Sequence, residues 1–151
     1  EPFPPPRWAV RFVLDASVAL AWFLPDEAPE VTRYAAAVLA HIKAQQAFCV
    51  VPHVWHAEVG GKILRRLRAN RLSQEAFDRA EAFYHGMPIE TRQSDHTLRS
   101  LVERARRYHL QAIDVLYFEI ALDLGLAIAT VDRGLRAGAQ RHGVKLFAPP
   151  A

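Results

Sequence analysis

The segment from Ala112 to Leu124 is apolar around most of a helical circumference, which predicts a helix buried on nearly all sides. Gly125 follows at the position of a C-terminal cap. Leu126 to Thr130 is then a short apolar run of strand length, and Asp132 follows it closely. A buried helix that leads directly into a buried strand is typical of α/β proteins, in which helices cover both faces of a sheet.

Strand-like and helix-like patterns also alternate along the rest of the chain. We expect further strands at Val10 to Leu14, Phe48 to Val51, Met87 to Glu90 and Val144 to Phe147. We expect six further helices. The first begins at a cap at Ser17 and stops at Pro25, and another is opened by Pro52. The remaining four cover Pro29 to Gln46, Leu72-Ser73 to about Tyr84, about Asp95 to Tyr108, and Asp132 to His142. This alternation predicts a three-layer α/β/α domain with a mainly parallel central sheet.

Apolar stripes indicate which sides of two helices face the core. In the helix after Pro52 the stripe consists of Trp55, Val59, Ile63 and Leu67, and in the helix before Tyr108 it consists of Leu98, Leu101, Val102 and Ala105. Gly60-Gly61 interrupts the first of these helices at a cost of roughly 1 kcal/mol per glycine relative to alanine. The pair indicates either close approach of another backbone or subunit, or a tolerated weakness.

Length and composition favour one domain in a reducing compartment. The chain has 151 residues, of which 51% are hydrophobic and 23% are charged, as is typical of globular domains. The only cysteine is Cys49, so neither an internal disulfide nor a cysteine-based zinc site can form. We expect a proline-rich tail over residues 1–9, a folded domain over residues 10–148, no membrane span or signal peptide, and a cytoplasmic location.

Four acidic residues occupy positions that can carry chemistry, although each also has a simpler structural interpretation. Asp15 and Asp132 each follow a strand, at the sheet edge where α/β proteins bind ligands, but an aspartate there often only caps the next helix. Asp114 lies early in the apolar helix, where a carboxylate interacts favourably with the helix dipole. Glu58 flanks an apolar stripe and could form an ion pair with Lys62.

As a set, the four acids predict a divalent-cation site. Carboxylates gathered in a partly desolvated cleft repel one another, so they must take up protons or bind a cation. Mg²⁺ or Mn²⁺ is expected, because both prefer hard oxygen ligands and keep waters that a phosphate can displace. Such an ion polarises a phosphoryl oxygen and lowers the pKa of a water. This is the chemistry of phosphodiester hydrolysis.

The acids lie in four segments: Phe12-Val13-Leu14-Asp15-Ala16-Ser17, Val51-Pro52 through His56-Ala57-Glu58-Val59, Ala112-Ile113-Asp114-Val115-Leu116-Tyr117, and Ala129-Thr130-Val131-Asp132. Together, in this order and with these intervals, they resemble the signature segments of the PIN-domain ribonucleases, and among these the VapC-type toxins of bacterial toxin–antitoxin pairs. The resemblance covers roughly the region from Arg11 to Phe147. It implies a three-layer α/β/α PIN-like domain with a mainly parallel central sheet.

The resemblance also implies roles for particular residues. Asp15, Glu58, Asp114 and Asp132 would be the catalytic acids, binding one or two Mg²⁺ or Mn²⁺ ions and positioning the attacking water. Ser17 and Thr130 occupy matching polar positions and would hydrogen-bond the acids or their waters. Attack by water does not need the 2′-hydroxyl, so the products would carry a 5′-phosphate and a 3′-hydroxyl. The preference for RNA comes from the family.

The activity implied by the resemblance is that of a Mg²⁺-dependent endoribonuclease, acting as the toxin of a pair. A cognate antitoxin protein and a homodimeric assembly are implied in the same way. Basic clusters at Arg65, Arg66, Arg68 and Arg71 and at Arg104, Arg106 and Arg107 would contact phosphates or form a solvated helix face. Arg65, Arg133 and Arg136 are the candidate RNA contacts. The role of Glu119, five residues beyond Asp114, stays open.

Two other classes of protein could carry strand-end acids of this kind. A catalytically silent RNA-binding or protein-binding module with this fold would keep its acids for structure, and the four intact acids argue against it. A phospho-receiver domain also uses strand-end acids and Mg²⁺. It would need adjacent acids after the first strand, where Ala16 stands, and a phosphorylated aspartate after the strand Phe48 to Val51, which supplies none.

Overall fold

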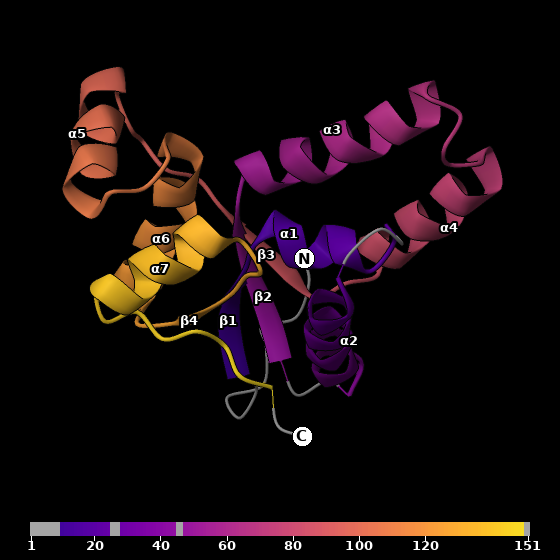
Figure 1. Cartoon of the computed structure of the whole chain (residues 1–151), viewed down its shortest axis with the longest axis horizontal. Coiled ribbons are helices and arrows are strands. Elements are labelled where there is room, and N and C mark those ends of the chain that lie inside the picture. Colours follow the sequence, from indigo (N-terminus) through magenta and orange to yellow (C-terminus); the bar gives the residue numbers. More distant parts are fainter. Residues whose placement is uncertain (1–9, 25–27, 45–46, 150–151) are drawn as a thin grey trace.

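The computed structural model describes residues 10–24, 28–44 and 47–149, so the tail over residues 1–9, the predicted stop at Pro25 and the predicted helix end at Gln46 lie outside the described residues. Strands and helices alternate along the described chain (Figure 1). They are β1 (Val10–Leu14), α1 (Ala16–Ala21), α2 (Pro29–Lys43), β2 (Ala47–Pro52), α3 (Val54–Arg68), α4 (Gln74–His85), β3 (Ile89–Arg92), α5 (Leu98–Tyr108), α6 (Ala112–Leu124), β4 (Ala127–Ala129) and α7 (Arg133–Arg141).

The four strands of the described chain form one sheet in the order β3-β2-β1-β4, and every neighbouring pair is parallel. Phe12 of β1 lies opposite Cys49 of β2 on one side and Ala127 of β4 on the other. Because parallel strands all end at the same edge, the residues that follow β1 and β4 are brought next to each other. The Asp15 amide donates to the Ala129 carbonyl at 2.9 Å, which joins these two strand ends.

Helices cover both faces of the sheet, as the alternating pattern predicts (Figure 1). Helix α2 packs on β2 and contacts α1, whereas α6 packs on β1, β2 and β4 and contacts α5 and α7. Helix α3 crosses the carboxyl edge of the sheet and contacts α1, and α4 folds back beside it (Figure 1). The predicted three-layer α/β/α fold with a parallel central sheet is therefore confirmed.

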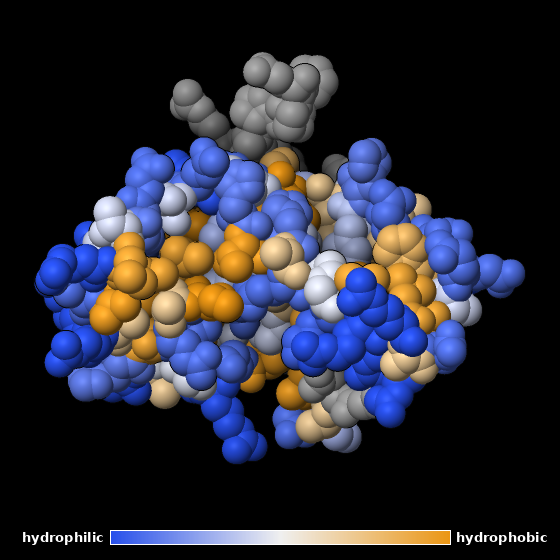
Figure 2. All heavy atoms as spheres, turned by 90° about the horizontal axis from the view of Figure 1, so that it is seen from above, coloured by the Kyte–Doolittle hydropathy of each residue, from blue (hydrophilic) through white to orange (hydrophobic). Residues whose placement is uncertain are grey.

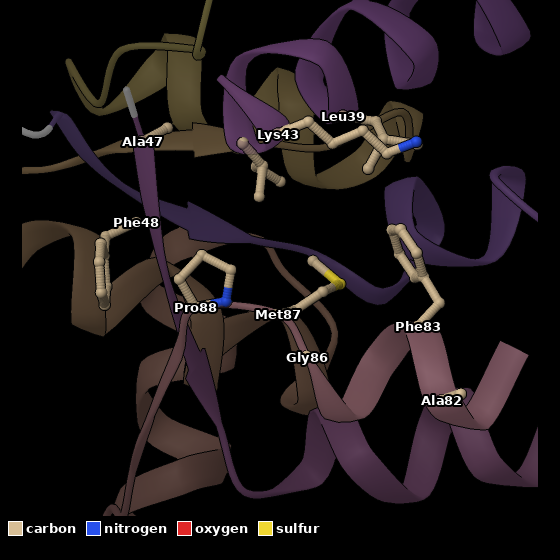
Figure 3. A pocket seen from close by; sticks show the side chains of 10 residues that line it. Leu39, Lys43, Ala47, Phe48, Ala82, Phe83, Gly86, Met87 and Pro88 are labelled. Carbon is tan, nitrogen blue, oxygen red and sulfur yellow. The ribbon is translucent and has the colours of Figure 1, made fainter. Parts of the chain in front are cut away.

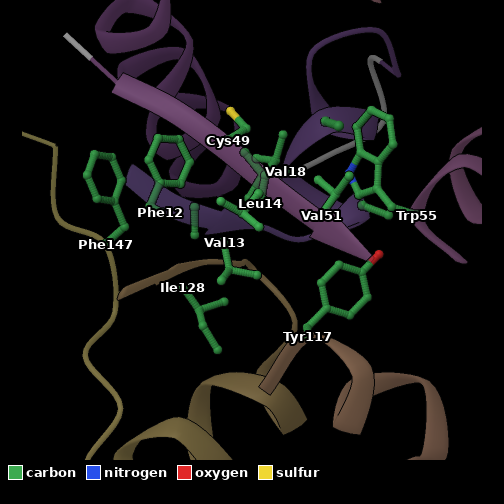
Figure 4. Close-up of a cluster of buried hydrophobic side chains, with 14 of the residues drawn as sticks. Phe12, Val13, Leu14, Val18, Cys49, Val51, Trp55, Tyr117, Ile128 and Phe147 are labelled. Atoms are coloured by element: carbon green, nitrogen blue, oxygen red, sulfur yellow. The ribbon is translucent and has the colours of Figure 1, made fainter. Parts of the chain in front are cut away.

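The core is formed by the strands together with the helices that pack on both faces of the sheet (Figure 4). Val13, Val50 and Ile128 are fully buried in the sheet, and the rings of Phe12 and Phe147 stack with centroids 4.2 Å apart. Burying one such side chain contributes about 1.5–3 kcal/mol, so these few contacts hold the strand ends in place beneath the acids. The helix predicted over Ala112 to Leu124 has these bounds in the structure.

Two predicted boundaries were wrong. Ser17 does not cap the first helix, because the helix begins at Ala16 and Asp15 takes the cap position. Pro52 does not open a helix but ends β2, where it pairs with Arg92 of β3. Proline lacks an amide hydrogen, which is compatible with the last position of a strand as well as with the first turn of a helix.

The strands predicted near residues 87–90 and 144–147 also differ from those observed. The first is β3, which begins two residues later than expected, at Ile89. The second is reduced to a single parallel bridge between Leu146 and Ile128. Its neighbour β4 is only three residues long, so there is little ladder for a fifth strand to extend.

The stripe predicted to bury α5 was partly wrong. Leu98 is 83% exposed and Val102 is 45% exposed, whereas Leu101 and Ala105 pack partly buried against the core. The helix covers α6 through one narrow side, so the rest of its apolar face reaches the surface. Figure 2 shows hydrophobic side chains exposed on the side of the molecule where α5 lies in Figure 1.

The structure confirms one expectation about glycines and narrows another, since approach of a second subunit and a tolerated weakness stay open for Gly60-Gly61. Gly125 ends α6 with a φ of 64°, the left-handed conformation that favours glycine at a C-terminal cap. Gly60 and Gly61 have open space within 4 Å of where a Cβ would lie, so no close approach inside the described chain explains them. A search of the described residues found no helix with the length and hydropathy needed to cross a bilayer.

Candidate active site

Asp15 is the most buried of the four acids, with 5% of its surface exposed. It follows β1 directly, and its Oδ2 accepts hydrogen bonds from Ser17 Oγ at 2.5 Å and from Thr130 Oγ1 at 2.7 Å. Both hydroxyls thus hold one carboxylate oxygen in a fixed direction. The hydrogen bonds that the resemblance implies for Ser17 and Thr130 are therefore present.

The same two hydroxyls also hold the loop that carries Asp132. Ser17 Oγ accepts from the Val131 amide at 3.2 Å, and Thr130 Oγ1 accepts from the Asp132 amide at 3.0 Å. Asp132 itself caps α7, because its Oδ2 accepts from the Leu135 amide at 2.8 Å. The structural role considered for Asp132 is therefore real, and it leaves the side chain exposed at the carboxyl edge of the sheet.

Glu58 and Asp114 come from two helices that approach this edge from different sides. Glu58 lies in the second turn of α3, and its Oε1 accepts a 2.6 Å hydrogen bond from Tyr117 Oη. Asp114 lies in the first turn of α6, where the helix dipole favours a negative charge. Both side chains are half-buried.

One cavity of about 540 Å³ brings the four acids together. Its walls include residues from the start of α1, from α3, from the first turn of α6 and from the N-cap of α7. The lining residues are Asp15, Ala16, Ser17, Leu20, Leu24, Glu58, Lys62, Arg65, Arg66, Arg71, Gln111, Ile113, Asp114 and Asp132. Acids that are up to 117 positions apart in the sequence therefore share one pocket.

Burial and neighbouring carboxylates raise the pKa values of Asp15, Glu58 and Asp114. Burial, and then the negative charges of Asp132, Asp15 and Glu58, raise the pKa of Asp114 to about 7. Burial also raises the pKa of Asp15 and that of Glu58, although hydrogen bonds from Ser17, Thr130 and Tyr117 act in the opposite direction. Carboxylates in this arrangement gain from a neighbouring cation, because it removes the repulsion that otherwise favours protonation.

The carboxylates of the pocket fit a divalent ion that keeps several of its waters better than an ion coordinated by protein side chains alone. Among the described residues, no group of three or more His, Cys, Asp or Glu side chains is already arranged to hold a metal ion. Mg²⁺ keeps several waters and is bound through one or two carboxylates, so the remaining acids can reach it through water. All four acids offer hard oxygen ligands, and the 540 Å³ cavity leaves room for the waters.

Positive charges line the wall of the cavity next to Glu58. Lys62, Arg65 and Arg66 follow Glu58 along α3, and Arg71 joins them from the turn after the helix. The positive charge of Lys62 acts to lower the pKa of Glu58, whereas the hydrogen bond to that carboxylate comes from Tyr117. The pocket therefore combines four acids with a group of basic residues from α3 and the turn after it.

The other candidate RNA contacts differ in their surroundings. Arg133 is exposed at the start of α7. Arg136 is partly buried, donates from Nη1 to the Thr130 carbonyl at 2.7 Å, and lies over the ring of Tyr34. These contacts give Arg136 a structural role at the end of β4, and its contact with RNA stays a prediction.

Glu119 does not join the acidic pocket. It points to another side of α6, where it forms an ion pair with Arg104 and contacts His96 Nε2 at 2.7 Å. Its side chain is only 19% exposed. Glu119 therefore ties α5 and the segment before it to α6, which answers the question left open by the sequence.

A second cavity, of about 610 Å³, lies at the opposite end of the sheet (Figure 3). It is formed by α2, the start of β2 and the segment between α4 and β3. The residues around it are mainly apolar, and Lys43 is the charged one: Leu39, Ile42, Lys43, Ala47, Phe48, Ala82, Phe83, Gly86, Met87 and Pro88. The described residues that line it include no carboxylate, so the acidic pocket is the better candidate for metal-dependent catalysis.

Tyr117 is the residue of the site that sequence reasoning missed. It lies in a helix predicted to be buried, where an aromatic side chain is ordinarily part of the core. Its spacing of three residues from Asp114 could have indicated that both side chains lie on the same side of α6. The partner of its hydroxyl, however, is 59 positions away in the sequence.

Comparisons with known proteins agree with this fold. A family model described as PIN domain matches residues 12–141, which include all four acids. The crystal structure of PAE2754 from Pyrobaculum aerophilum is similar, with a TM-score of 0.60, 22% sequence identity, and 86% of each chain covered. That likeness concerns the fold alone. No curated protein sequence matched the chain in the comparison.

Proposed function

The chain belongs to the PIN domain family, and from this premise we propose that it is a Mg²⁺- or Mn²⁺-dependent endoribonuclease that hydrolyses RNA phosphodiester bonds. PIN domains are generally nucleases. The observation that carries the proposal is the convergence of Asp15, Glu58, Asp114 and Asp132 on one pocket with a basic wall. An acidic centre suits a divalent cation, and arginines beside it suit the phosphates of a nucleic acid.

In this proposal the four carboxylates have a shared task. They hold the cation and orient the attacking water, while Ser17 and Thr130 keep Asp15 in a fixed direction. A divalent cation, when bound, polarises a phosphoryl oxygen and makes a water more acidic. The raised pKa values of Asp15, Glu58 and Asp114 are consistent with this role, because such acids are poised to exchange protons for a cation.

The basic wall supplies the other half of RNA binding. Arg65 and Arg71 are exposed at the pocket, where their planar guanidinium groups can each give two hydrogen bonds to a phosphate. Arg133 lies next to Asp132 and is a further candidate contact. Contacts of this kind follow the phosphate backbone, so they bind RNA without selecting its sequence.

We propose further that this nuclease is the toxin of a toxin–antitoxin pair, inhibited by a cognate antitoxin protein and assembled as a homodimer. The support for this is the resemblance of the four acidic segments to VapC-type toxins. Expression without an antitoxin should then arrest bacterial growth, and Asp15→Asn should relieve the arrest. Toxicity that persists in Asp15→Asn would remove Asp15 from the catalytic role.

The enzyme activity is tested by incubating the purified protein, freed of any copurified partner, with a mixed RNA pool and Mg²⁺. Cleavage that stops in EDTA and leaves 5′-phosphate and 3′-hydroxyl ends supports hydrolysis by water. Products with 2′,3′-cyclic phosphates would contradict it, because they require the 2′-hydroxyl as nucleophile. Absence of cleavage, together with absence of Mn²⁺ binding in calorimetry, would favour the silent binding module instead.

A further inference from the structure

We infer that Tyr117 is a positioning residue of the acidic pocket, which acts by holding the Glu58 carboxylate in the direction that cation binding requires. The inference deepens the proposed function and rests on it. Tyr117 is three residues beyond Asp114 on α6, whereas Glu58 is on α3. One helix therefore supplies an acid to the pocket and also orients an acid that belongs to another helix.

The geometry of this contact is well defined. Tyr117 is fully buried, and its Oη donates to Glu58 Oε1 at 2.6 Å. Figure 4 shows its ring within the packed core, with the hydroxyl oxygen pointing away from the aliphatic side chains and toward the end of β2. A ring fixed by the core places its hydroxyl at one point in space. The hydroxyl can therefore act as a rigid anchor.

Glu58 needs such an anchor more than the aspartates do. Its side chain has one more rotatable bond than that of aspartate, and Lys62, one turn further along α3, attracts the carboxylate toward the basic wall. The Tyr117 hydroxyl holds Oε1 on the side of the pocket where α6 carries Asp114. Oε2 can then serve as a single ligand atom toward the cation.

The two strand-end acids are held by different donors. Asp15 is oriented by Ser17 and Thr130, and Asp132 by the Leu135 amide. Tyr117 does for Glu58 what these groups do for the two aspartates. Outer-shell partners of this kind change metal affinity by about 10–100-fold when they are removed, although they do not touch the metal.

The test replaces Tyr117 by phenylalanine, which removes the hydroxyl and keeps the ring. In Tyr117→Phe we expect Mn²⁺ affinity, measured by calorimetry, to fall about tenfold. The kcat for RNA should fall at low Mn²⁺ and recover at high Mn²⁺, while the KM for RNA stays unchanged.

Tyr84→Phe is the matched control, because Tyr84 is also a packed tyrosine, but its hydroxyl donates to the Ala19 carbonyl outside the pocket. It should bind Mn²⁺ like the wild type.

A double-mutant cycle separates action through Glu58 from a general effect on the core. In the Glu58→Gln background, adding Tyr117→Phe should weaken Mn²⁺ binding little further. A full additional tenfold loss there, wild-type affinity in Tyr117→Phe, or an equal loss in Tyr84→Phe would each overturn the inference while leaving the proposed function intact. A wild-type protein that neither binds Mn²⁺ nor cleaves RNA would overturn the proposed function and this inference with it.

If Tyr117→Phe does not melt cooperatively, Tyr117→Met takes its place, since methionine also lacks the hydroxyl and adapts easily to a core.

Discussion

The Thr130 hydroxyl donates a 2.7 Å hydrogen bond to Asp15 Oδ2, which joins the residue after β4 to the residue after β1. Both residues are buried, so water competes little for this contact. The same hydroxyl accepts from the Asp132 amide at 3.0 Å. Thr130 thus sets the direction of one acid and the backbone position of another.

Replacing Thr130 by valine, which has nearly the same shape, should reveal this double role. Asp15 would lose a donor inside the protein, so we expect the free energy of unfolding to fall by about 1–3 kcal/mol. We also expect weaker Mn²⁺ binding in calorimetry. Thr91→Val is the control, because the Thr91 hydroxyl pairs with the exposed His56 ring at 2.9 Å and not with one of the four acids. Equal Mn²⁺ affinity in both variants would contradict the role of Thr130.

The pKa of Asp114, raised to about 7 from an ordinary 3.8, gives the metal-free protein a distinct pH dependence. Between about pH 4 and pH 7 the folded protein keeps a proton here that the unfolded chain releases. The free energy of unfolding should therefore fall as the pH rises through this range. Asp114→Asn should lack this pH dependence. At about pH 8 its free energy of unfolding should be higher than that of the wild type by about 1 kcal/mol. The difference is kept small because water screens the half-buried side chain. Urea unfolding in EDTA at several pH values measures the free energy of unfolding of both proteins. If it changes with pH equally in the wild type and in Asp114→Asn, the raised pKa of Asp114 is refuted.

Arg65 on the basic wall should contribute to RNA binding rather than to the chemical step. Arg65→Ala is expected to raise the KM for RNA, leave kcat nearly unchanged, and lower the salt dependence of binding by about one phosphate contact. Arg106→Ala tests the cluster on α5 under the same conditions. Should Arg106→Ala weaken RNA binding more than Arg65→Ala, the RNA path would run over α5 instead of α3.

Glu119 should be important for stability and not for activity, because its partners are His96 and Arg104 and not the pocket. Glu119→Gln is expected to lower the free energy of unfolding by about 1–3 kcal/mol, since its partners are partly buried. Glu103→Gln is the matched control on α5, where the ion pair with Arg99 is exposed and spans 3.8 Å. Its effect should stay below about 0.5 kcal/mol. Loss of Mn²⁺ affinity in Glu119→Gln would place Glu119 in the site after all.

The sequence predicted best those elements whose burial and ends are indicated by residues within or next to the element itself. Helix α6 is apolar on nearly all sides and is followed by Gly125, so both its burial and its end could be predicted. Helix α5 shows the limit of this reasoning. Its apolar stripe was recognised, but periodicity cannot tell whether another element covers it, and Leu98 and Val102 are exposed.

The same distinction applies to the site. Asp15 and Asp132 follow apolar strands, so their meeting at one sheet edge could be predicted from parallel topology alone. The hydrogen bond between Tyr117 and Glu58 could not, because it joins residues of two helices that lie 59 positions apart in the sequence. Glu119 is similar, since its distance of five residues from Asp114 turns it to another side of the helix, toward partners on α5 and in the preceding segment.

The measurement that tests the central claim most directly is the rate of RNA cleavage at increasing Mn²⁺, compared between the wild type, Asp114→Asn and Asp123→Asn. Asp123 is the matched control, because it lies on the same helix but lines a different cavity, beside Glu119. We predict cleavage that depends on Mn²⁺ in the wild type and in Asp123→Asn, and a rate at least about 100-fold lower in Asp114→Asn. Wild-type rates in Asp114→Asn would contradict the claim that these four acids form the catalytic centre.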